Sequence, residues 1–267
     1  MKSQDIIKKL PAYVDCLQSR AEYTFSEADA LQALRCSVIA FRHAAQRLVS
    51  KKRIARIRSC YYVIVPMEYS SIGVPTPHWY LDSLMRHYFK LPYYVGLLTA
   101  AALQGAAHQQ PQVFQVITTK QLRPIHLPRT QIRFYVKRNI DEQFVEKRNT
   151  PAGYMSISKP ELTALDLVQY AESSGHLNNV ATVLAELAEA LNVEQLVLAA
   201  QKFPCVVTQR LGYLLEKFTN LDIEKLHQWF IAQSIRTTVL MPGKKYRGSK
   251  QNKRWKIWVN EKVEADL

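Results

Sequence analysis

The sequence is short of cysteine, glycine and long apolar runs, and these shortages exclude several classes of protein. Its four cysteines, Cys16, Cys36, Cys60 and Cys205, form no Cys-x-x-Cys pair. Such spacing argues against a zinc site or a disulfide framework and fits a reducing compartment. No window approaches the roughly 18 consecutive apolar residues that a membrane helix needs. The first residues also lack the apolar run of a signal peptide. We therefore expect a cytoplasmic protein that makes no use of a membrane.

The signatures of common catalytic sites are missing as well. The sequence contains no GxGxxG, GxxxxGK[ST], GxSxG or HExxH motif, and none of its seven histidines has metal-ligand spacing to another His or Cys. Glu161 and Asp166 leave a nuclease-like metal site open, since some nucleases bind metal ions through carboxylates near a sheet edge. The strands expected before them supply no further acid, however, and Glu161 suits a helix cap. We expect neither enzymatic activity nor a cofactor or metal ion.

Acidic residues are absent from three long tracts of the chain. Overall, 36 Lys and Arg against 22 Asp and Glu give a net charge of +14. Residues 30–67 carry eight basic residues, residues 83–140 another eight, and residues 225–260 nine. A positive excess of this size attracts polyanions, among which nucleic acid is the leading candidate. One basic tract is readily explained as a solvated face, whereas three tracts favour an extended basic surface.

The first acid-free tract has helical spacing followed by a β-prone segment. Thr24 and Glu27 have the spacing of a capping box, which predicts a helix beginning one residue after Thr24. After a short turn, Ser37 suits the N-cap of a second helix over residues 38–51. The segment RIARIRSCYYVIV, residues 53–65, then predicts a β-hairpin. We expect Arg56 and Arg58 to share one face of its first strand.

This order of elements is that of a winged helix-turn-helix. At about 100° per residue, the second helix places His43, Gln46 and Arg47 opposite its apolar residues. In a winged helix-turn-helix, such a helix lies in the major groove, and flanking cations contact phosphates. An acidic side chain on that surface would be repelled, which explains the missing Asp and Glu. A small α+β domain with a solvated basic face remains the alternative.

The remainder of the chain predicts a larger mixed domain. Pro, Gly and Ser in MEYSSIGVPTPHWY suggest a linker, so we expect a winged helix-turn-helix domain over residues 1–75 and an α+β domain over residues 76–267. The second domain should hold a helix over residues 92–107, four short strands and a second capping box between Ser158 and Glu161. Mainly helical sequence follows, and two strands close the chain around a basic loop. A candidate second basic surface comprises Lys120, Arg123, Arg133, Lys137, Lys244, Lys245 and Arg247. We expect Trp255 and Trp258 to share a strand face and to belong to the core.

Several segments resemble the AbiEi family of bacterial abortive-infection antitoxins, the antitoxin half of a type IV toxin–antitoxin pair. They are TFSEADALQALRCS, AFRHAAQRLVSKKRIARI, YYVIVP, YYVGLLTAAALQGA, FQVITTKQLRPI, GYMSISKPELTALDLVQY and QRLGYLLEKF. Together they extend from about residue 20 to residue 218. The first block is common to winged helices in general, whereas ELTALDLVQY and QRLGYLLE are more specific to the family.

The resemblance implies a repressor that binds inverted repeats of double-stranded DNA in its own promoter. Its second domain would counter a nucleotidyltransferase-type toxin, without a stable complex between the two proteins. Through the winged-helix pattern, the DNA-contacting residues correspond to Ser37, Arg42, His43, Gln46, Arg47, Lys51, Lys52, Arg53, Arg56 and Arg58. The hairpin departs from related wings because it lacks a glycine both before its first strand and in its turn. Two alternatives stay open: a nuclease-like enzyme, and a module that binds the toxin directly.

Overall fold

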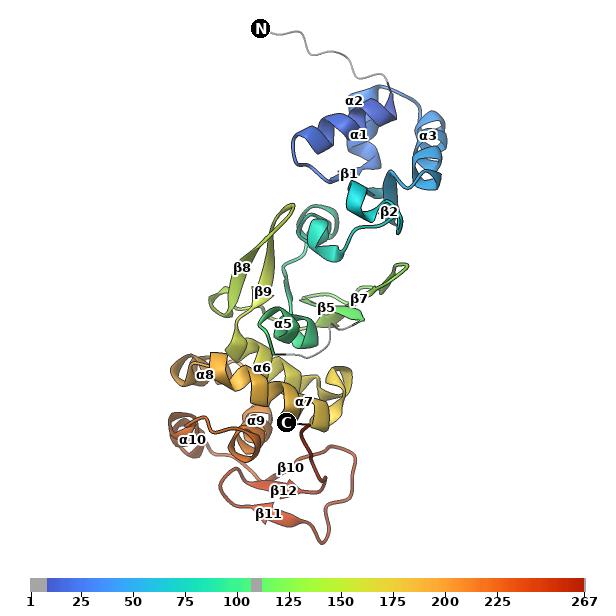
Figure 1. The fold of residues 1–267 in the computed structure, drawn as a ribbon. Helices are drawn as coiled ribbons and strands as arrows, with labels where there is room; N and C mark the ends of the chain where they lie inside the picture. Colours follow the sequence, from blue (N-terminus) through green and yellow to red (C-terminus); the bar gives the residue numbers. More distant parts are fainter. Residues whose placement is uncertain (1–8, 107–111, 267) are drawn as a thin grey trace. The chain divides into compact units, whose positions relative to one another are not determined.

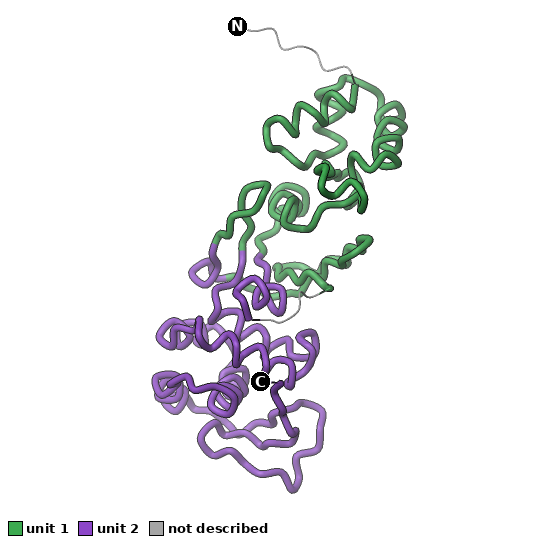
Figure 2. The backbone as a smooth tube through the Cα atoms, viewed as in Figure 1, with its two compact units in different colours: residues 1–93, 112–140, 147–156 green, residues 94–111, 141–146, 157–267 purple. Residues whose placement is uncertain are grey.

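A computed structural model of the protein describes residues 9–106 and 112–266. The fold is mixed α+β, as the sequence predicts, with helices and three sheets. Contacts within the chain divide it into two units (Figure 2). Unit 1 comprises residues 1–93, 112–140 and 147–156, and unit 2 comprises residues 94–111, 141–146 and 157–267. Within the described residues, no helix has the length and apolar character needed to cross a membrane.

Unit 1 begins with three helices that share a core. They are α1 (Leu10–Ser19), α2 (Glu27–Leu34) and α3 (Val38–Ser50), drawn in blue in Figure 1. Buried apolar residues from all three helices belong to one cluster, which also includes Phe25 and Tyr62. Pro11 stands in the first turn of α1, where its missing N–H costs nothing. The helix therefore continues past this proline to Ser19.

The capping box of α2 lies two residues later than predicted. The Ser26 hydroxyl accepts a hydrogen bond from the Asp29 N–H at 3.1 Å, and the Asp29 carboxylate accepts one from the Ser26 N–H at 3.2 Å. Thr24 instead belongs to strand β1 (Thr24–Ser26), and its hydroxyl is 2.8 Å from that of Ser83. Pairing of β1 with another strand holds Thr24 in an extended conformation, so the helix begins only at Glu27.

The predicted hairpin is present and forms a sheet with β1. Strands β2 (Ile54–Arg58) and β3 (Tyr61–Ile64) pair antiparallel, and the strand order is β1-β3-β2. The register shifts between Arg56 and Arg58, where the ladder passes from Arg56↔Tyr62 to Arg58↔Tyr61. Cys60 occupies the turn with φ +57°. A non-glycine residue thus takes the left-handed conformation for which the sequence offered no glycine.

The remaining part of unit 1 packs against this first region, so contacts cross the domain boundary predicted after residue 75. Its elements are η1 (Met67–Tyr69), η2 (Pro77–Trp79), α4 (Leu81–Ser83), the π-helical η3 (Leu84–Phe89), β5 (Val113–Thr118), β6 (Ile125–His126), β7 (Gln131–Val136) and residues 147–150 of β8 (Val145–Thr150). β5 and β7 pair parallel, and β6 pairs antiparallel with β7. The Tyr23 and Trp79 rings meet edge to face, with their centroids 4.6 Å apart. A separate domain over residues 1–75 therefore stays a prediction.

Two strands differ from the sequence-based expectation. The segment predicted as a helix over residues 92–107 begins with strand β4 (Tyr93–Val95), and helix α5 (Leu97–Leu103) starts only after Gly96. Within unit 2, Val95 of β4 pairs parallel with Ile157 of β9 (Gly153–Ser158). The aromatic and β-branched residues of β4 suit a strand. The alanines that follow them favour a helix, however, and the whole segment was therefore predicted to be helical. Strand β8 was missed because VEKRNT is polar and largely exposed.

Five helices make up most of unit 2, as the sequence predicts. They are α6 (Pro160–Gln169), α7 (His176–Leu187), α8 (Val193–Ala200), α9 (Cys205–Phe218) and α10 (Glu224–Ile231). The short turns η5 (Ala171–Ser174) and η6 (Ala188–Ala190) follow α6 and α7, whereas η4 (Glu142–Phe144) precedes β8. Helix α6 contacts α7, α8 and α9 (Figure 1). Most of its residues are buried. The predicted capping box of α6 is wrong. The Ser158 hydroxyl lies 2.7 Å from that of Thr163, and Glu161 accepts a hydrogen bond from the Asn192 N–H at 2.9 Å.

A small sheet at the end of the chain packs against α9. Its strands β10 (Thr238–Val239), β11 (Lys250–Asn252) and β12 (Ile257–Val259) have the order β10-β12-β11. Trp255 lies in the turn before β12 and is fully buried, which confirms its place in the core. Its indole N–H donates to Glu216 at 2.9 Å. Trp258 belongs to β12 and is half-buried, so the prediction that the two rings share a strand face is wrong.

Candidate nucleic-acid interface

Helix α3 has a buried side and an exposed polar side, as its periodicity predicts. Phe41, Ala45 and Leu48 are buried in the core of unit 1. The side chains predicted to point outward include Arg47 and its neighbours His43 and Gln46, and all three residues are exposed. The helix therefore presents a row of hydrogen-bonding side chains to solvent.

The beginning of α3 is capped and carries exposed apolar side chains. The Ser37 hydroxyl accepts a hydrogen bond from the Ala40 N–H at 3.2 Å, which confirms Ser37 as the N-cap. Ile39 is 71% exposed and Val38 is 41% exposed, although both are aliphatic. The first turn of α3 thus offers a small apolar surface next to its polar face.

Arg42 is paired with an acidic residue that precedes the acid-free tract. Its guanidinium donates to the Glu27 carboxylate at 3.1 Å, and only 10% of the Glu27 side chain is exposed. This hydrogen bond raises the pKa of Arg42 above its usual value. The carboxylate offsets the charge of Arg42, so this arginine adds less to the positive field of the surface than its sequence position suggested.

The basic run that follows α3 is only partly free. The Lys52 ammonium donates to the Ser71 carbonyl, and the Lys52 backbone has φ +53°. Arg53 pairs with the Asp15 carboxylate at 2.6 Å. Lys51 is exposed and has no ion pair or side-chain hydrogen bond with any described residue. Of this run, Lys51 is therefore the cation most available to a phosphate.

The two hairpin arginines occupy different environments. Arg56 is exposed, whereas the Arg58 guanidinium donates to the Arg123 carbonyl and lies 5.8 Å from the centroid of the Phe89 ring. Burial lowers the pKa of Arg58. The extra residue between the pairs Arg56↔Tyr62 and Arg58↔Tyr61 explains the difference. The partners Tyr61 and Tyr62 are consecutive residues of β3, and consecutive residues of a strand face opposite sides of the sheet. Arg56 and Arg58 therefore do not share a face, contrary to the prediction.

A groove of about 600 Å³ lies between α3 and the hairpin. Its polar lining includes Arg42 and Gln46 from α3, Arg56 from β2, and the Glu27 carboxylate. Tyr62 and Ala45 contribute to its apolar floor. The structure thus brings Gln46 of α3 and the first hairpin arginine to one concave surface, whereas His43 and Arg47 are not among its lining residues.

The candidate second basic surface divides between the two units. Lys120, Arg123, Arg133 and Lys137 belong to unit 1, and Lys244, Lys245 and Arg247 belong to unit 2. Arg133 is exposed on β7, whereas the Lys244 ammonium pairs with Glu261. The two groups are accordingly considered separately, and a nucleic-acid role for either stays a prediction.

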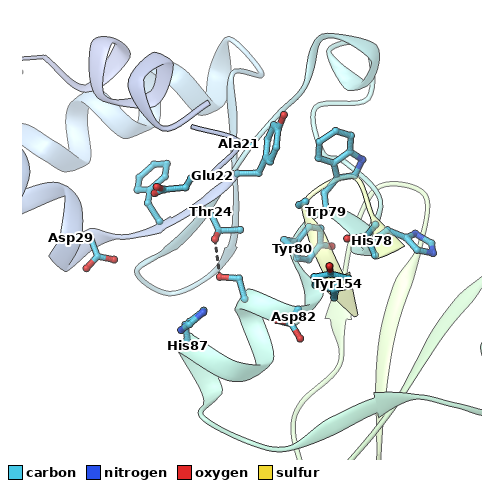
Figure 3. A pocket seen from close by; sticks show the side chains of 15 residues that line it. Ala21, Glu22, Thr24, Asp29, His78, Trp79, Tyr80, Asp82, His87 and Tyr154 are labelled. Atoms are coloured by element: carbon cyan, nitrogen blue, oxygen red, sulfur yellow. Dashed lines mark hydrogen bonds between the residues drawn. The ribbon is translucent and has the colours of Figure 1, made fainter. Parts of the chain in front are cut away.

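A further cavity of about 430 Å³ in unit 1 has the opposite character (Figure 3). The carboxylates of Glu22, Asp29 and Asp82 line it together with several aromatic rings, and neither Lys nor Arg does so within the described residues. Asp29 caps α2, and Asp82 accepts hydrogen bonds from Arg86 and Tyr93, each at 2.8 Å. This cavity therefore does not extend the basic surface.

The carboxylates that left a nuclease-like site open are used in packing. Asp166 is fully buried, and its carboxylate accepts a hydrogen bond from the Tyr94 hydroxyl at 2.6 Å. Glu161 is buried as well and accepts the Asn192 N–H. Among the described residues, no three or more His, Cys, Asp or Glu side chains are grouped so that they could hold a metal ion. These carboxylates accept hydrogen bonds from other parts of unit 2.

Comparison with known proteins gives a match to a protein family. Residues 94–217 match the family model described as "AbiEi antitoxin C-terminal domain". These residues form an AbiEi antitoxin C-terminal domain. The two segments that resemble the family most specifically, in α6 and α9, lie within the match. The presence of this AbiEi antitoxin domain supports a toxin–antitoxin role.

The fold of the chain is also found in a solved structure. The crystal structure of the RV2827C protein from Mycobacterium tuberculosis superposes with a TM-score of 0.68 at 14% sequence identity. The similarity covers 96% of this chain and 92% of the other. At this identity, it establishes a shared fold. No curated protein matches the sequence.

Proposed function

We propose that this chain, which contains an AbiEi antitoxin domain, is also a sequence-specific DNA-binding repressor that autoregulates its operon. In this proposal, residues 1–75 form a winged helix-turn-helix that binds inverted repeats in the chain's own promoter, and the protein acts as the antitoxin of a type IV pair. The region matched by the family model would counter a nucleotidyltransferase-type toxin, without a stable complex between the two proteins. The cytoplasm would be the place of action, and the chain would not be an enzyme.

The exposed face of α3 carries the proposal. Arg47, Lys51 and Arg56 are exposed and have no ion pair with any described residue. Three uncompensated cations next to a row of hydrogen-bonding side chains suit a helix in the major groove, where phosphate contacts set the position and base contacts read sequence. Arg47 lies among the outward residues of the helix, whereas Lys51 follows its end. We therefore assign base contact to Arg47 and phosphate contact to Lys51.

The salt dependence of binding follows from this count of cations. On B-DNA, log K falls by about 0.9 per phosphate contact for each unit of log salt. If Lys51 and Arg56 each contact one phosphate, they contribute roughly 1.8 to the slope for each bound chain. Lys51→Ala should then reduce the slope by about 0.9 per bound chain.

The test is binding of the full-length protein to about 200 base pairs upstream of its own gene, compared with scrambled DNA of equal length at two salt concentrations. Arg47→Ala should cost about 1–3 kcal/mol on the upstream DNA and little on scrambled DNA. Lys51→Ala should weaken both to the same extent. Lys253→Ala, which removes an exposed charge from unit 2, is the matched control and should leave the preference unchanged.

Either of two outcomes would reject parts of the proposal. Equal affinity of the unmodified protein for both DNAs would remove sequence-specific repression. Equal losses on both DNAs for Arg47→Ala would remove the base-reading role of that residue while leaving DNA binding intact. A footprint over inverted repeats would support autoregulation.

A further inference from the structure

The small sheet at the end of unit 2 carries an exposed loop to which the antitoxin role assigns no purpose. The loop joins β10 to β11, and its sequence GKKYRG, residues 243–248, is bounded by two glycines with φ +79° and +86°. Its base is held in place, because the Asn260 amide donates to the Met241 carbonyl at 2.8 Å and to the Lys244 carbonyl at 3.0 Å. The family match ends at residue 217 and therefore does not account for the loop.

Two cations of the loop are uncompensated. The Lys244 ammonium pairs with Glu261, so this lysine helps to hold the base of the loop. Lys245 and Arg247 are exposed, and neither has an ion pair or a side-chain hydrogen bond with any described residue. The surrounding sequence, residues 225–260, contains no Asp or Glu. The tip of the loop is therefore positive and attracts a polyanion.

An aromatic ring stands between these two cations in the sequence. Tyr246 is 49% exposed, although its ring is large and mostly apolar. The ring lies on that of Trp258 in β12, with the centroids 6.0 Å apart and the planes tilted by 35°. The contact with Trp258 orients the Tyr246 ring, and the exposed part of the ring is available to a second flat group. Proteins stack the bases of single strands on aromatic rings that are flanked by cations in this way.

The two faces of the sheet differ in what they offer a ligand. Gln251 of β11 pairs with Trp258, so the side chains of these two residues share the face on which Tyr246 lies. Lys250 precedes Gln251 and projects from the opposite face, because consecutive residues of a strand alternate. Lys250 is also exposed and has no ion pair with any described residue. This lysine thus has the same charge as Lys245 but does not share the face of the aromatic pair.

We propose that this loop binds single-stranded nucleic acid, with Tyr246 stacking on a base and with Lys245 and Arg247 contacting the phosphates beside it. The bases of a duplex are stacked on one another, so an exposed ring favours a strand whose bases are unpaired. An acidic protein would suit the two cations but would leave the aromatic ring without a role. RNA and single-stranded DNA share the chemistry of base and phosphate, and the experiment distinguishes them. DNA binding by α3 plays no part in this site, since α3 belongs to unit 1.

The test measures binding of labelled oligo(U) and oligo(dT), each about ten nucleotides long, to the full-length protein by fluorescence anisotropy at low salt. Binding of either strand supports the proposal, and the tighter of the two identifies the sugar. Tyr246→Ala should weaken oligonucleotide binding by about tenfold, because one base loses its stacking partner. Tyr246→Phe keeps the ring and should stay within about twofold of the unmodified protein. Lys51→Ala, which alters the surface of unit 1, should also leave oligonucleotide affinity within about twofold.

Lys245→Ala and Lys250→Ala form a matched pair, since both remove an exposed lysine from the same unit. Loss of one phosphate contact on a single strand reduces the slope of log K against log salt by about 0.7. Lys245→Ala should show this reduction. Lys250→Ala should leave the slope unchanged, because its side chain lies on the other face of the sheet.

Three results would overturn the proposal. The first is a Tyr246→Ala protein that binds oligonucleotides as tightly as the unmodified protein does. The second is an equal loss of oligonucleotide affinity in Lys51→Ala, which would place the binding on unit 1. The third is competition by polyglutamate as effective as competition by unlabelled oligo(U), since the loop would then recognise acidic chains in general, including those of a protein. None of these outcomes depends on whether the protein represses its operon.

Discussion

Replacing Gly212 by alanine is a direct test of how the small carboxy-terminal sheet packs on α9. A Cβ atom at this position would lie 2.3 Å from one carbon of the Trp255 ring and 2.4 Å from two others. Carbon atoms in good contact are about 3.5–4.0 Å apart. Trp255 is fully buried, and its indole N–H is bound to Glu216. The ring therefore has to shift by about an ångström while surrounded by packed atoms.

Two opposing terms set the size of the effect. Overpacking a close-packed core costs about 1–3 kcal/mol, and a displacement of this size belongs at the upper end of that range. Replacing glycine by alanine in a helix interior stabilises the helix by about 1 kcal/mol. The clash thus exceeds the gain in helix propensity. We expect Gly212→Ala to lower the free energy of unfolding by about 2 kcal/mol.

Urea unfolding followed by circular dichroism measures this difference, and a second pair of variants identifies its cause. In a Trp255→Leu background, the smaller side chain leaves room for the added methyl group. There, Gly212→Ala should be neutral or stabilising, so the two substitutions should be strongly non-additive. A Gly212→Ala protein as stable as the unmodified one would refute the packing described for α9. The same loss in both backgrounds would refute Trp255 as its cause.

Three further predictions concern the cap of α3, its apolar first turn and alkaline pH. Ser37→Ala should lower the free energy of unfolding by about 1 kcal/mol in urea titrations, because the Ala40 N–H loses its acceptor. Ile39→Ala should reduce affinity for upstream DNA by less than about 1 kcal/mol and abolish any effect of replacing thymine by uracil, since an exposed aliphatic group can contact the thymine methyl. An unchanged response to uracil would contradict this contact. Burial raises the pKa of Tyr170 to about 12, and burial together with Asp166 raises that of Tyr94. The folded protein therefore holds these protons more tightly, so urea midpoints should be steady below about pH 10 and fall above it, with a smaller fall in Tyr94→Phe.

Local signals in the sequence were enough to predict α3 and the hairpin. The N-cap at Ser37 and the helical spacing of the apolar residues that follow depend on interactions within a few residues, and the structure confirms both. β-Branched and aromatic residues likewise predicted β2 and β3. The capping box of α2 was placed two residues early because Thr24 satisfies the same local pattern as Ser26. Pairing of β1 with β3, which involves distant residues, decided between the two.

The sequence by itself determined the charge of the surface, the outward face of α3 and the resemblance to the AbiEi family. Only the tertiary structure decided which cations remain available. Arg42, Arg53 and Arg58 find partners 15, 38 and 65 residues away along the chain. Helical or strand periodicity contains no information about contacts at such separations, since it describes neighbours within one element.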